Sequence, residues 1–431
     1  MQAATLRHGA SAILLATAVL LAGAGGATAS AGGPASTVPA APSWCPKAPR
    51  LPEPSGPVIR VDTVEALFQA AREVKAGGTI LVADGHYMMP RYFEIRTDDV
   101  TLRGASGRRE RVVLDGARSS HGELLGITGC SGVTVADLTV RNVKWNGIKI
   151  NSDRFATRVT IRNCVVHNVW QRGVKGPRVR PEDRDRFRPS DCRIQWCLFT
   201  NDRPKQFADD PADRQHGFGG NYVGGIDVMY PRRWTISRNV FVGIRGRTGE
   251  ARGAVFLWHE AEDCIVERNV IIDCDSGICL GNSYRPDDVP VHATRCIVRN
   301  NFLARCPEQG ILADYTRQCR ILHNTIHDPG SRLKRLIRLV HDNDGLVVAG
   351  NLLSGPPMRV DTDSPVTVEH NLTKDVTGWF ADAAGGNLHL VPGALPESAR
   401  VPRRKTVPED IDGEARPSET AVGADEPGEA P

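Results

Sequence analysis

The stretch GAVFLWHE, residues 253–260, begins like a buried strand and ends in three side chains with useful chemistry. Trp258 can stack on a sugar ring, His259 can take up a proton near neutral pH, and Glu260 can serve as an acid or a base. Such groups at the end of an apolar strand predict a binding or catalytic surface. Their role depends on which strands lie beside them.

The chain repeats one pattern, in which two short strands and a polar turn are followed by a Gly and another apolar strand. Aligned on [VI]-x-x-N-x-apolar, the copies follow one another at 26, 33, 42, 30, 32, 23, 27 and 20 residues. Their residues at this phase are Leu138, Cys164, Cys197, Asn239, Asn269, Asn301, Asn324, Asn351 and Asn371. A coil that returns to the same place adds one parallel strand about 4.8 Å above the last, and stacked coils make the core. The sequence therefore predicts an all-β parallel solenoid with an internal ladder of Asn side chains.

These repeats and the entry segment AGGTILVADGHY, residues 76–87, resemble the pectate-lyase-like superfamily, and the entry segment is especially similar to the chondroitinase B and alginate-lyase family. The resemblance covers roughly residues 60–395. It implies a single-stranded right-handed parallel β-helix, in a superfamily that includes secreted polysaccharide lyases and hydrolases. A short capping helix is expected within 61–78, where Asp62 and Glu65 resemble a capping box and two glycines follow.

Four segments are expected along the chain. Residues 1–29 read as a signal peptide, because one Arg precedes an apolar run of 11 residues and a small-residue cleavage site. The alternative, a membrane anchor, is disfavoured by the shortness of that run. Residues 30–58 read as a Pro/Ala/Gly-rich linker, 59–395 as the β-helix, and 396–431 as an acidic, disordered tail. We expect a secreted or periplasmic protein.

The eleven cysteines of an exported chain could form disulfides. Four of them, Cys192, Cys264, Cys296 and Cys319, instead recur five residues before the ladder position. This phase favours small core residues stacked coil on coil, although some stacked pairs could oxidise. No CxxC pair is present, so a zinc site is not expected.

One face of the strand that follows each Gly points outward. Its first column is Lys149, Lys175, Asp227, Phe256, Cys279, Leu312 and Arg338. Trp258 and Asp314 follow two residues later, and His259, Tyr315 and Glu260 lie just beyond. The longest insertions, 176–190, 201–222, 245–253 and 283–295, also fall in these middle coils. The pattern favours a functional groove over an ordinary polar face.

A groove of this kind suits an anionic polysaccharide. Our leading hypothesis is a lyase in which His259 or Lys175 is the base for β-elimination and Arg252 or Arg247 neutralises the uronic-acid carboxylate. Trp258 and Tyr315 would stack on sugars. Lys149, Asp314 and Arg338 complete the expected binding set. A glycoside hydrolase using Asp227, Glu260 or Asp314 is the second hypothesis. A non-catalytic glycan-binding or surface β-helix is the third.

The family's catalytic motif is not retained. In the chondroitinase B and alginate-lyase family, that motif has a calcium-binding pair of acids, a catalytic Lys a few residues later and a catalytic Arg one coil further. Here Arg252 and Ala254 fall at the acid positions, His259 at the Lys position and Gly281 near the Arg position. No metal ligands are therefore assigned, and the cofactor stays open between calcium and none.

The formal charge of +4 combines an acidic stretch, 406–431, with a basic body. A basic body suits an anionic polymer, but no Lys/Arg cluster is interleaved with aromatic residues, so nucleic acid is not expected. We expect a monomer that, after signal cleavage, does not associate with membranes.

Overall fold

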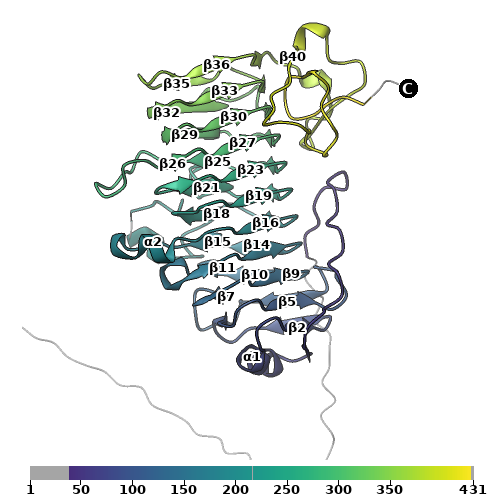
Figure 1. Ribbon diagram of the computed structural model, residues 1–431, viewed down its shortest axis with the longest axis vertical. Coiled ribbons are helices and arrows are strands. Elements are labelled where there is room, and N and C mark those ends of the chain that lie inside the picture. The colour runs from purple at the N-terminus through teal and green to yellow at the C-terminus, as the bar shows by residue number, and fades with distance from the viewer. Residues whose placement is uncertain (1–37, 216, 429–431) are drawn as a thin grey trace, which may run out of the picture. The chain divides into compact units, whose positions relative to one another are not determined.

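The computed structural model describes residues 38–215 and 217–428. In this part of the chain each coil adds one short strand to each of three parallel sheets, which we call A, B and C (Figure 1). The predicted all-β class and the β-helix are confirmed. The predicted signal peptide lies outside the described residues.

The strands follow one another along each sheet in chain order, as expected for a solenoid. Sheet A contains β1 (Val58–Val61), β2 (Thr79–Val82), β5 (Thr101–Gly104), β9 (Thr134–Ala136), β13 (Thr160–Arg162), β16 (Arg193–Gln195), β19 (Thr235–Ser237), β23 (Ile265–Glu267), β27 (Ile297–Arg299), β30 (Arg320–Leu322), β33 (Val347–Ala349) and β36 (Thr367–Glu369). Sheet B contains β3 (Gly85–Met88), β6 (Val112–Asp115), β10 (Thr139–Val143), β14 (Val165–Val169), β17 (Leu198–Thr200), β20 (Val240–Val242), β24 (Val270–Ile272), β28 (Phe302–Ala304), β31 (Thr325–His327), β34 (Leu352–Ser354) and β37 (Leu372–Thr373).

Sheet C carries the predicted outward column. It contains β4 (Phe93–Ile95), β7 (Leu125–Ile127), β11 (Asn146–Ile150), β15 (Arg172–Gly176), β18 (Gly224–Met229), β21 (Val255–Trp258), β25 (Ser276–Leu280), β29 (Gln309–Arg317), β32 (Ile337–Asp344) and β35 (Arg359–Asp361), with β22 (Ala261–Glu262) and β26 (Ala293–Thr294) joined to the end of β29. The small pairs are β8 (Cys130–Ser131) with β12 (Ala156–Thr157), β38 (Phe380–Asp382) with β39 (Asn387–Leu390), and β40 (Arg400–Pro402) with β41 (Glu419–Ala421).

The turn between sheets A and B contains the predicted Asn ladder. Asn269, directly before β24, donates from Nδ2 to Oδ1 of Asn301 at 3.0 Å, and Asn301 donates to Asn324 at 2.9 Å. The same oxygens also accept backbone N–H groups, such as that of Asn269. The ladder runs unbroken from Asn239 to Asn371. It fixes the register of every coil that it joins.

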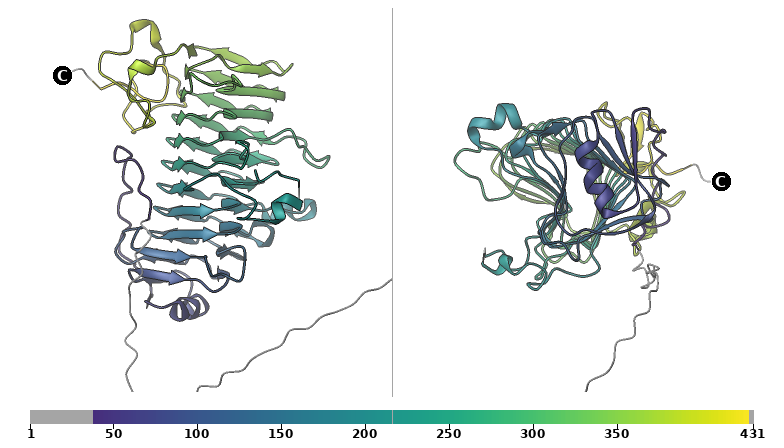
Figure 2. Two further views of the ribbon diagram at one scale, coloured as in Figure 1. Left: turned by 180° about the vertical axis from the view of Figure 1, so that it is seen from behind. Right: turned by 90° about the horizontal axis from the view of Figure 1, so that it is seen from below.

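The helix α1 (Val64–Glu73) covers the first coil, as the view from below in Figure 2 shows. Its buried residues include Leu67 and Ala70. The prediction of a helix here is confirmed, but the predicted Asp62–Glu65 cap is wrong. Thr63 is the N-cap, and its hydroxyl accepts the N–H of Ala66 at 3.1 Å.

All eleven cysteines are buried and free. The prediction that they act as core residues is therefore confirmed. Burial raises the pKa of the Cys192 thiol to about 12, so this thiol is protonated at neutral pH.

From β14 to β34 the outward face of sheet B is largely apolar, and both ends of the described chain cover it. Residues 38–45 and the segment 396–428 pack there, and Phe302 and Leu352 lie beneath them. The prediction that 396–431 is disordered is wrong for residues 396–428, because Val407, Ile411 and their apolar neighbours are buried among the acids. The predicted linker is likewise ordered from residue 38 on, since it covers the same face.

Two insertions fold over the edges of sheet C. The 176–190 insertion contains α2 (Arg184–Phe187), and the 201–222 insertion contains α3 (Ala212–Gln215). The second is fixed by the fully buried Lys205, whose ammonium group lies 2.8 Å from Asp213 and 3.5 Å from Asp210. The ammonium group of Lys205 also donates to the carbonyl of Tyr222. These buried contacts hold the described part of this loop in place against the coils.

Candidate functional site

The register of sheet C confirms the predicted outward column. Lys149 pairs with Lys175 on the next strand, and Lys175 pairs with Asp227. The column continues through Phe256, Cys279 and Leu312 to Arg338. The alternation of the sequence therefore placed these residues on one face, but their exposure differs greatly.

Lys175 and Asp227 form a buried ion pair. The Asp227 carboxylate lies 2.9 Å from the Lys175 ammonium group and 2.5 Å from Nε of Arg172, and it accepts the indole N–H of Trp258 at 3.0 Å. Burial alone would raise the pKa of Asp227, but the two cations outweigh it and lower that pKa to about 2. The Arg172 guanidinium stacks at 3.9 Å on Tyr222 of the 201–222 loop. This loop thus helps to cover the cluster.

His259 lies inside the turn that follows β21. It is 2% exposed, and its ring stacks on that of His292 at 5.4 Å. Burial, with smaller contributions from His292 and Arg178, lowers the pKa of His259 to about 3. The imidazole is therefore neutral at physiological pH and buried. A polymer that binds at the surface would not reach it.

The three carboxylates proposed for a hydrolase lie in separate surroundings. Asp227 is bound as described above, and Glu260 lies 3.7 Å from Arg184 of α2. Asp314 is buried, accepts from Ser283 at 3.1 Å and lies 2.8 Å from Nδ1 of His341. Burial raises its pKa, and the contact with His341 opposes that shift only in part.

The remaining predicted residues line the edges of the face. Lys149 lies 2.9 Å from Glu123 near the first coils, and Arg338 lies 3.5 Å from Asp361 near the last. Tyr315 is half-buried, and its ring stacks on His341 at 4.6 Å with the planes 2° apart. Trp258 is also half-buried and stacks on Phe256 at 4.7 Å. The structure therefore spreads this set over several coils.

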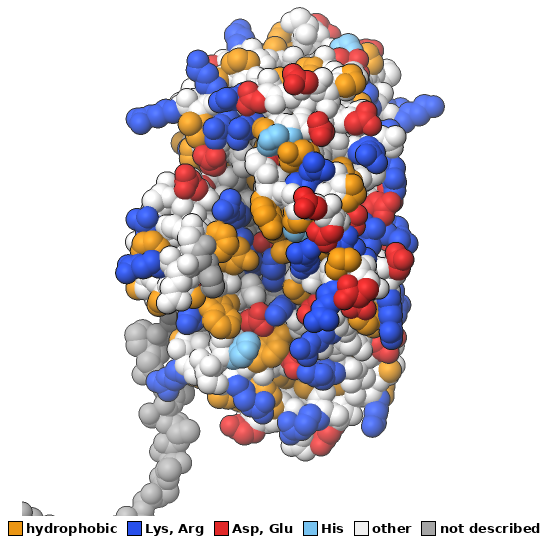
Figure 3. Space-filling model, turned by 90° about the vertical axis from the view of Figure 1, so that its left-hand side faces the viewer, with side chains coloured by type: hydrophobic (Ala, Val, Ile, Leu, Met, Phe, Trp, Pro, Cys, Tyr) orange, Lys and Arg blue, Asp and Glu red, His pale blue; other side chains and the backbone are white. Residues whose placement is uncertain are grey.

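A cleft of about 520 Å³ lies beside the middle of the column, and we call it the Arg cleft. Its lining includes Phe256, Cys279 and Leu312 of the outward column. Arg247 and Arg252, both exposed, also line it. Figure 3 shows the side of the molecule at the left of Figure 1, where hydrophobic side chains lie in a hollow and Lys and Arg gather around it.

The two arginines have no carboxylate partner among the described residues. Arg247 donates from Nε to the carbonyl of Gly219 at 2.8 Å and stacks over Phe207 at 4.6 Å. Arg252 lies 5.9 Å from the ring of Phe218. Their charge is therefore available to an anion that enters the cleft.

The same cleft contains two glutamates that the sequence analysis missed, Glu250 and Glu308. Burial raises the pKa of Glu308 above its usual value, although its carboxylate lies 2.8 Å from Arg335. Glu250 is exposed and accepts from Asn221 at 2.9 Å. Glu250 belongs to an insertion that the sequence marked, but Glu308 precedes β29, where no motif singles it out.

One group of possible metal ligands is present within residues 38–215 and 217–428. His389, Asp412 and Asp425 each offer a ligand atom, and these atoms lie within 4.8 Å of one another. His389 and Asp412 already bind each other at 3.0 Å, on the segments that cover sheet B. The group is thus not part of the Arg cleft.

The chain belongs to the family described as "Right handed beta helix region", whose model matches residues 123–353. The predicted handedness and the resemblance to pectate-lyase-like β-helices are thereby confirmed at the level of the fold. No curated protein sequence matches the chain significantly. Among the described residues, no helix is long and apolar enough to cross a membrane.

Solved structures with similar folds have different roles. The pectate lyase Pel9A is 12% identical with a TM-score of 0.49, and the match covers 84% of this chain and 90% of that one. An alginate lyase from Paenibacillus sp. str. FPU-7 is 10% identical with a TM-score of 0.41, and the match covers 73% of this chain and 98% of that one. The surface adhesin PfbA of Streptococcus pneumoniae is 10% identical with a TM-score of 0.41, and the match covers 71% of this chain and 86% of that one. At these identities the likeness concerns the fold and not the activity.

Proposed function

We propose that this protein binds an acidic polysaccharide in the Arg cleft and cleaves it. The observation that carries the proposal is the pair Arg247 and Arg252. Both are exposed, both line one cleft, and neither has a carboxylate partner among the described residues. A uronic-acid carboxylate would supply the missing partner.

The lining of the cleft suits a sugar chain in other respects. Phe256 and Leu312 lie in the floor of the cleft and are largely buried, so its accessible lining comes mainly from the groups around them. Asn282 and Gln309 offer amide groups to its hydroxyls. A cleft whose accessible lining is mainly polar and cationic suits a hydroxyl-rich anionic chain.

Elimination is the reaction that the arginines favour most directly. They would stabilise the negative charge that develops on the carboxylate when the adjacent C–H bond is broken. Because Lys175 and His259 are buried, we assign the base to the exposed Glu250. Glu250 takes the proton from C5, the electron pair forms the C4–C5 double bond, and the C4–O bond breaks. Protonated Glu308 then gives a proton to the leaving oxygen.

Hydrolysis is the second candidate, and the raised pKa of Glu308 favours it. A glycosidase needs one protonated carboxyl group to assist the leaving oxygen and one carboxylate to act as base or nucleophile. Glu308 and Glu250 would take these two roles in the same cleft.

The first experiment is a screen of the purified protein, with and without calcium, against alginate, polygalacturonate, chondroitin sulfate and ulvan. Absorbance near 235 nm reports the double bond of an elimination, and a reducing-sugar assay reports both reactions. We expect activity on at least one polymer and its loss in Arg247→Ala/Arg252→Ala. Arg193→Ala, an exposed Arg on sheet A, is the matched control.

Each outcome separates the candidates. Products that absorb indicate a lyase, and reducing ends without absorbance indicate a hydrolase. Binding without either product would leave a glycan-binding β-helix. Absence of both binding and cleavage would refute the proposal. We further propose export of the protein, which signal-peptide cleavage found by N-terminal sequencing of the secreted form would test.

A further inference from the structure

A second and larger cleft lies on the same side of the coils, at the turn between sheets B and C. Its volume is about 930 Å³, near the upper end of the range of about 300–1,000 Å³ for small-ligand sites. We call it the Trp cleft, because Trp145 and Trp170 line it. No sequence motif pointed to it.

The two indoles come from successive coils. Trp145 follows β10 and Trp170 follows β14, and Val143 pairs with Val169 just before them. The two turns are therefore about 4.8 Å apart along the stack. Asn146 in turn pairs with Arg172. Trp170 therefore lies opposite Lys144, and Trp145 lies opposite Gln171. The two indoles are thus offset by one residue along the turn and present two separate rings to the cleft.

Each indole is fixed in place and half-buried. Trp145 donates its ring N–H to Asp210 at 3.3 Å, and it packs closely on Gly122, where a Cβ would lie only 2.2 Å from the ring. The guanidinium of Arg203 lies 4.5 Å from the ring of Trp170. The platforms are thus organised before a ligand arrives.

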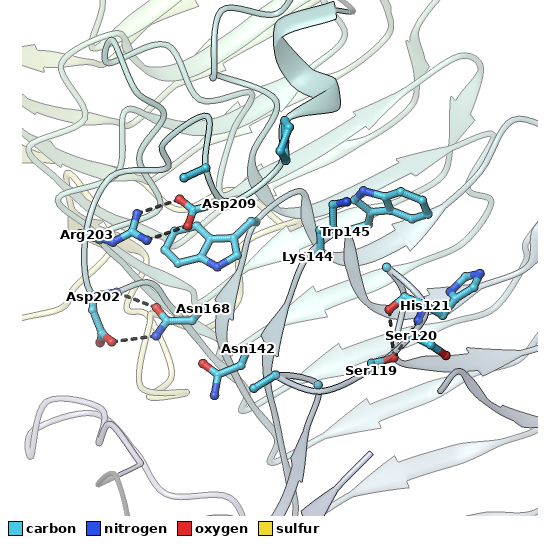
Figure 4. Close-up of a pocket in the computed structure, with 16 residues that line it drawn as sticks. Ser119, Ser120, His121, Asn142, Lys144, Trp145, Asn168, Asp202, Arg203 and Asp209 are labelled. Atoms are coloured by element: carbon cyan, nitrogen blue, oxygen red, sulfur yellow. Dashed lines mark hydrogen bonds and ion pairs between the residues drawn. The ribbon is translucent and has the colours of Figure 1, made fainter. Parts of the chain in front are cut away.

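The polar groups of the cleft are largely paired with one another. Arg203 donates to both oxygens of Asp209 at 2.7 Å each, and Asn168 donates to Asp202 at 2.8 Å. Figure 4 shows these two pairs, with Trp145 at the other side of the cleft. The cationic and anionic groups therefore nearly balance. The Trp cleft presents planar rings, hydrogen-bonding edges and one exposed cation, Lys144, whereas the Arg cleft presents two arginines without a carboxylate partner among the described residues.

The 201–222 loop separates the two clefts. Asp202, Arg203 and Asp209 line the Trp cleft, and Gly217 and Phe218 line the Arg cleft. Buried Lys205 fixes the loop between them. The coil of Trp170 and the coil of Phe256 are two steps apart, or about 10 Å along the stack.

We propose that the Trp cleft is a second carbohydrate site, which binds sugar rings by stacking and holds the same chain that the Arg cleft recognises by charge. The identity of that chain rests on the proposed function, but binding in the Trp cleft does not require cleavage. Arg203 is paired with Asp209, and the other cation of the lining, exposed Lys144, lies 5.4 Å from the ring of Trp145. The share of the binding that comes from stacking should persist at high salt, which screens Lys144 and the Arg cleft.

The test measures binding of polygalacturonate and of alginate by affinity electrophoresis and calorimetry, at 20 mM and at about 0.5 M NaCl. Trp145→Ala/Trp170→Ala should weaken the salt-resistant binding roughly tenfold or more, as loss of an aromatic anchor does. Trp145→Phe/Trp170→Phe, which keeps two flat rings, should recover most of it. Trp196→Ala is the matched control, because Trp196 is also half-buried beneath an Arg but lies outside both clefts.

The outcomes distinguish the two proposals. Loss with the Trp changes at high salt, and with Arg247→Ala/Arg252→Ala only at low salt, would support both sites. Binding that depends on the arginines alone would overturn the Trp cleft and leave the proposed function standing. Binding that depends on the tryptophans alone would support the Trp cleft and overturn the proposed role of the Arg cleft. Equal losses in Trp196→Ala, or no binding by the folded wild type, would overturn the Trp cleft.

Discussion

The ammonium group of Lys175 lies 2.9 Å from Oδ1 of Asp227, and neither side chain is more than 8% exposed. The pair joins neighbouring strands beneath the 201–222 loop. Trp258 and Arg172 complete the hydrogen bonds of the carboxylate. The geometry is that of a structural ion pair, although both residues were expected at the catalytic surface.

The first prediction concerns this pair. Asp227→Asn should lower the free energy of unfolding by about 3–5 kcal/mol, because it leaves Lys175 and Arg172 buried without a counter-charge. Lys149→Met, which removes the more exposed ion pair with Glu123, should cost about 1 kcal/mol or less. Urea unfolding followed by circular dichroism measures both. Equal losses would show that Asp227 is not the anchor of this face.

The second prediction concerns buried histidines. Burial is the largest cause that lowers the pKa of His259 and His323 to about 3 and that of His292 to about 4, against an ordinary value of 6.5. Below pH 6.5 the unfolded chain takes up these protons while the folded chain does not. These three residues should therefore make stability fall with falling pH, by about 2 kcal/mol per residue at pH 5. Asp425 acts in the opposite direction, because burial raises the pKa of its carboxyl to about 7 and the folded chain takes up that proton first.

The measurement is the melting temperature between pH 8 and pH 4. His323→Gln removes one of the three titrating groups, so its stability should depend less steeply on pH than that of the wild type. Gln318→Asn, at an exposed turn, is the control. Asp227 does not interfere in this window. Its pKa of about 2 lies below the ordinary 3.8, so its contribution is lost only as pH falls below about 4. A His323→Gln variant whose stability depends on pH as steeply as that of the wild type would contradict this account.

The sequence predicted the coils and the column because both depend on local periodicity. Asn239 and its counterparts mark each turn, and alternation along the strand placed Lys175, Asp227 and Arg338 on one face. The ladder and the register therefore follow from short-range pattern. The same reasoning placed the cysteines in the core.

Accessibility could not be predicted in the same way. Whether Lys175 meets solvent depends on how the 201–222 loop folds, and that loop is fixed by Lys205 and two distant carboxylates rather than by a repeat. His259 is buried because His292 returns from an insertion and stacks on it. The clefts likewise form between loops of different coils, so Glu308 and Trp145 carry no signal in the sequence alone.

The third prediction concerns the Arg cleft. Glu308→Gln should lower the rate of cleavage about 100-fold or more while binding is retained, because the amide cannot give a proton to the leaving oxygen. The raised pKa of Glu308 places the alkaline limb of its pH–rate profile above the ordinary Glu range. Glu267→Gln, on sheet A, is the control. A rate that is unchanged in Glu308→Gln would remove this residue from the mechanism.

The fourth prediction concerns the ladder. Asn301→Ala removes side-chain hydrogen bonds to Asn269, Asn324 and the carbonyl of Val266 and leaves a buried N–H unsatisfied. It should cost about 2–4 kcal/mol. Asn371→Ala, at the partly exposed end of the ladder, should cost less. Thermal unfolding compares the two, and an equal loss would argue against the role of burial.

The last prediction concerns the acidic segment 396–428. If it covers sheet B as the structure shows, its removal exposes the apolar surface around Phe302 and Leu352. The truncated protein should bind a hydrophobic dye and associate in light scattering. Ile411→Asp should act in the same direction, because it places a charge in that contact, whereas exposed Glu414→Lys should not. If the truncated protein stays monomeric with an unchanged melting temperature, the segment does not pack on sheet B. The sequence-based prediction of a disordered tail would then be correct, because a segment without packing contributes nothing to the stability of the folded state.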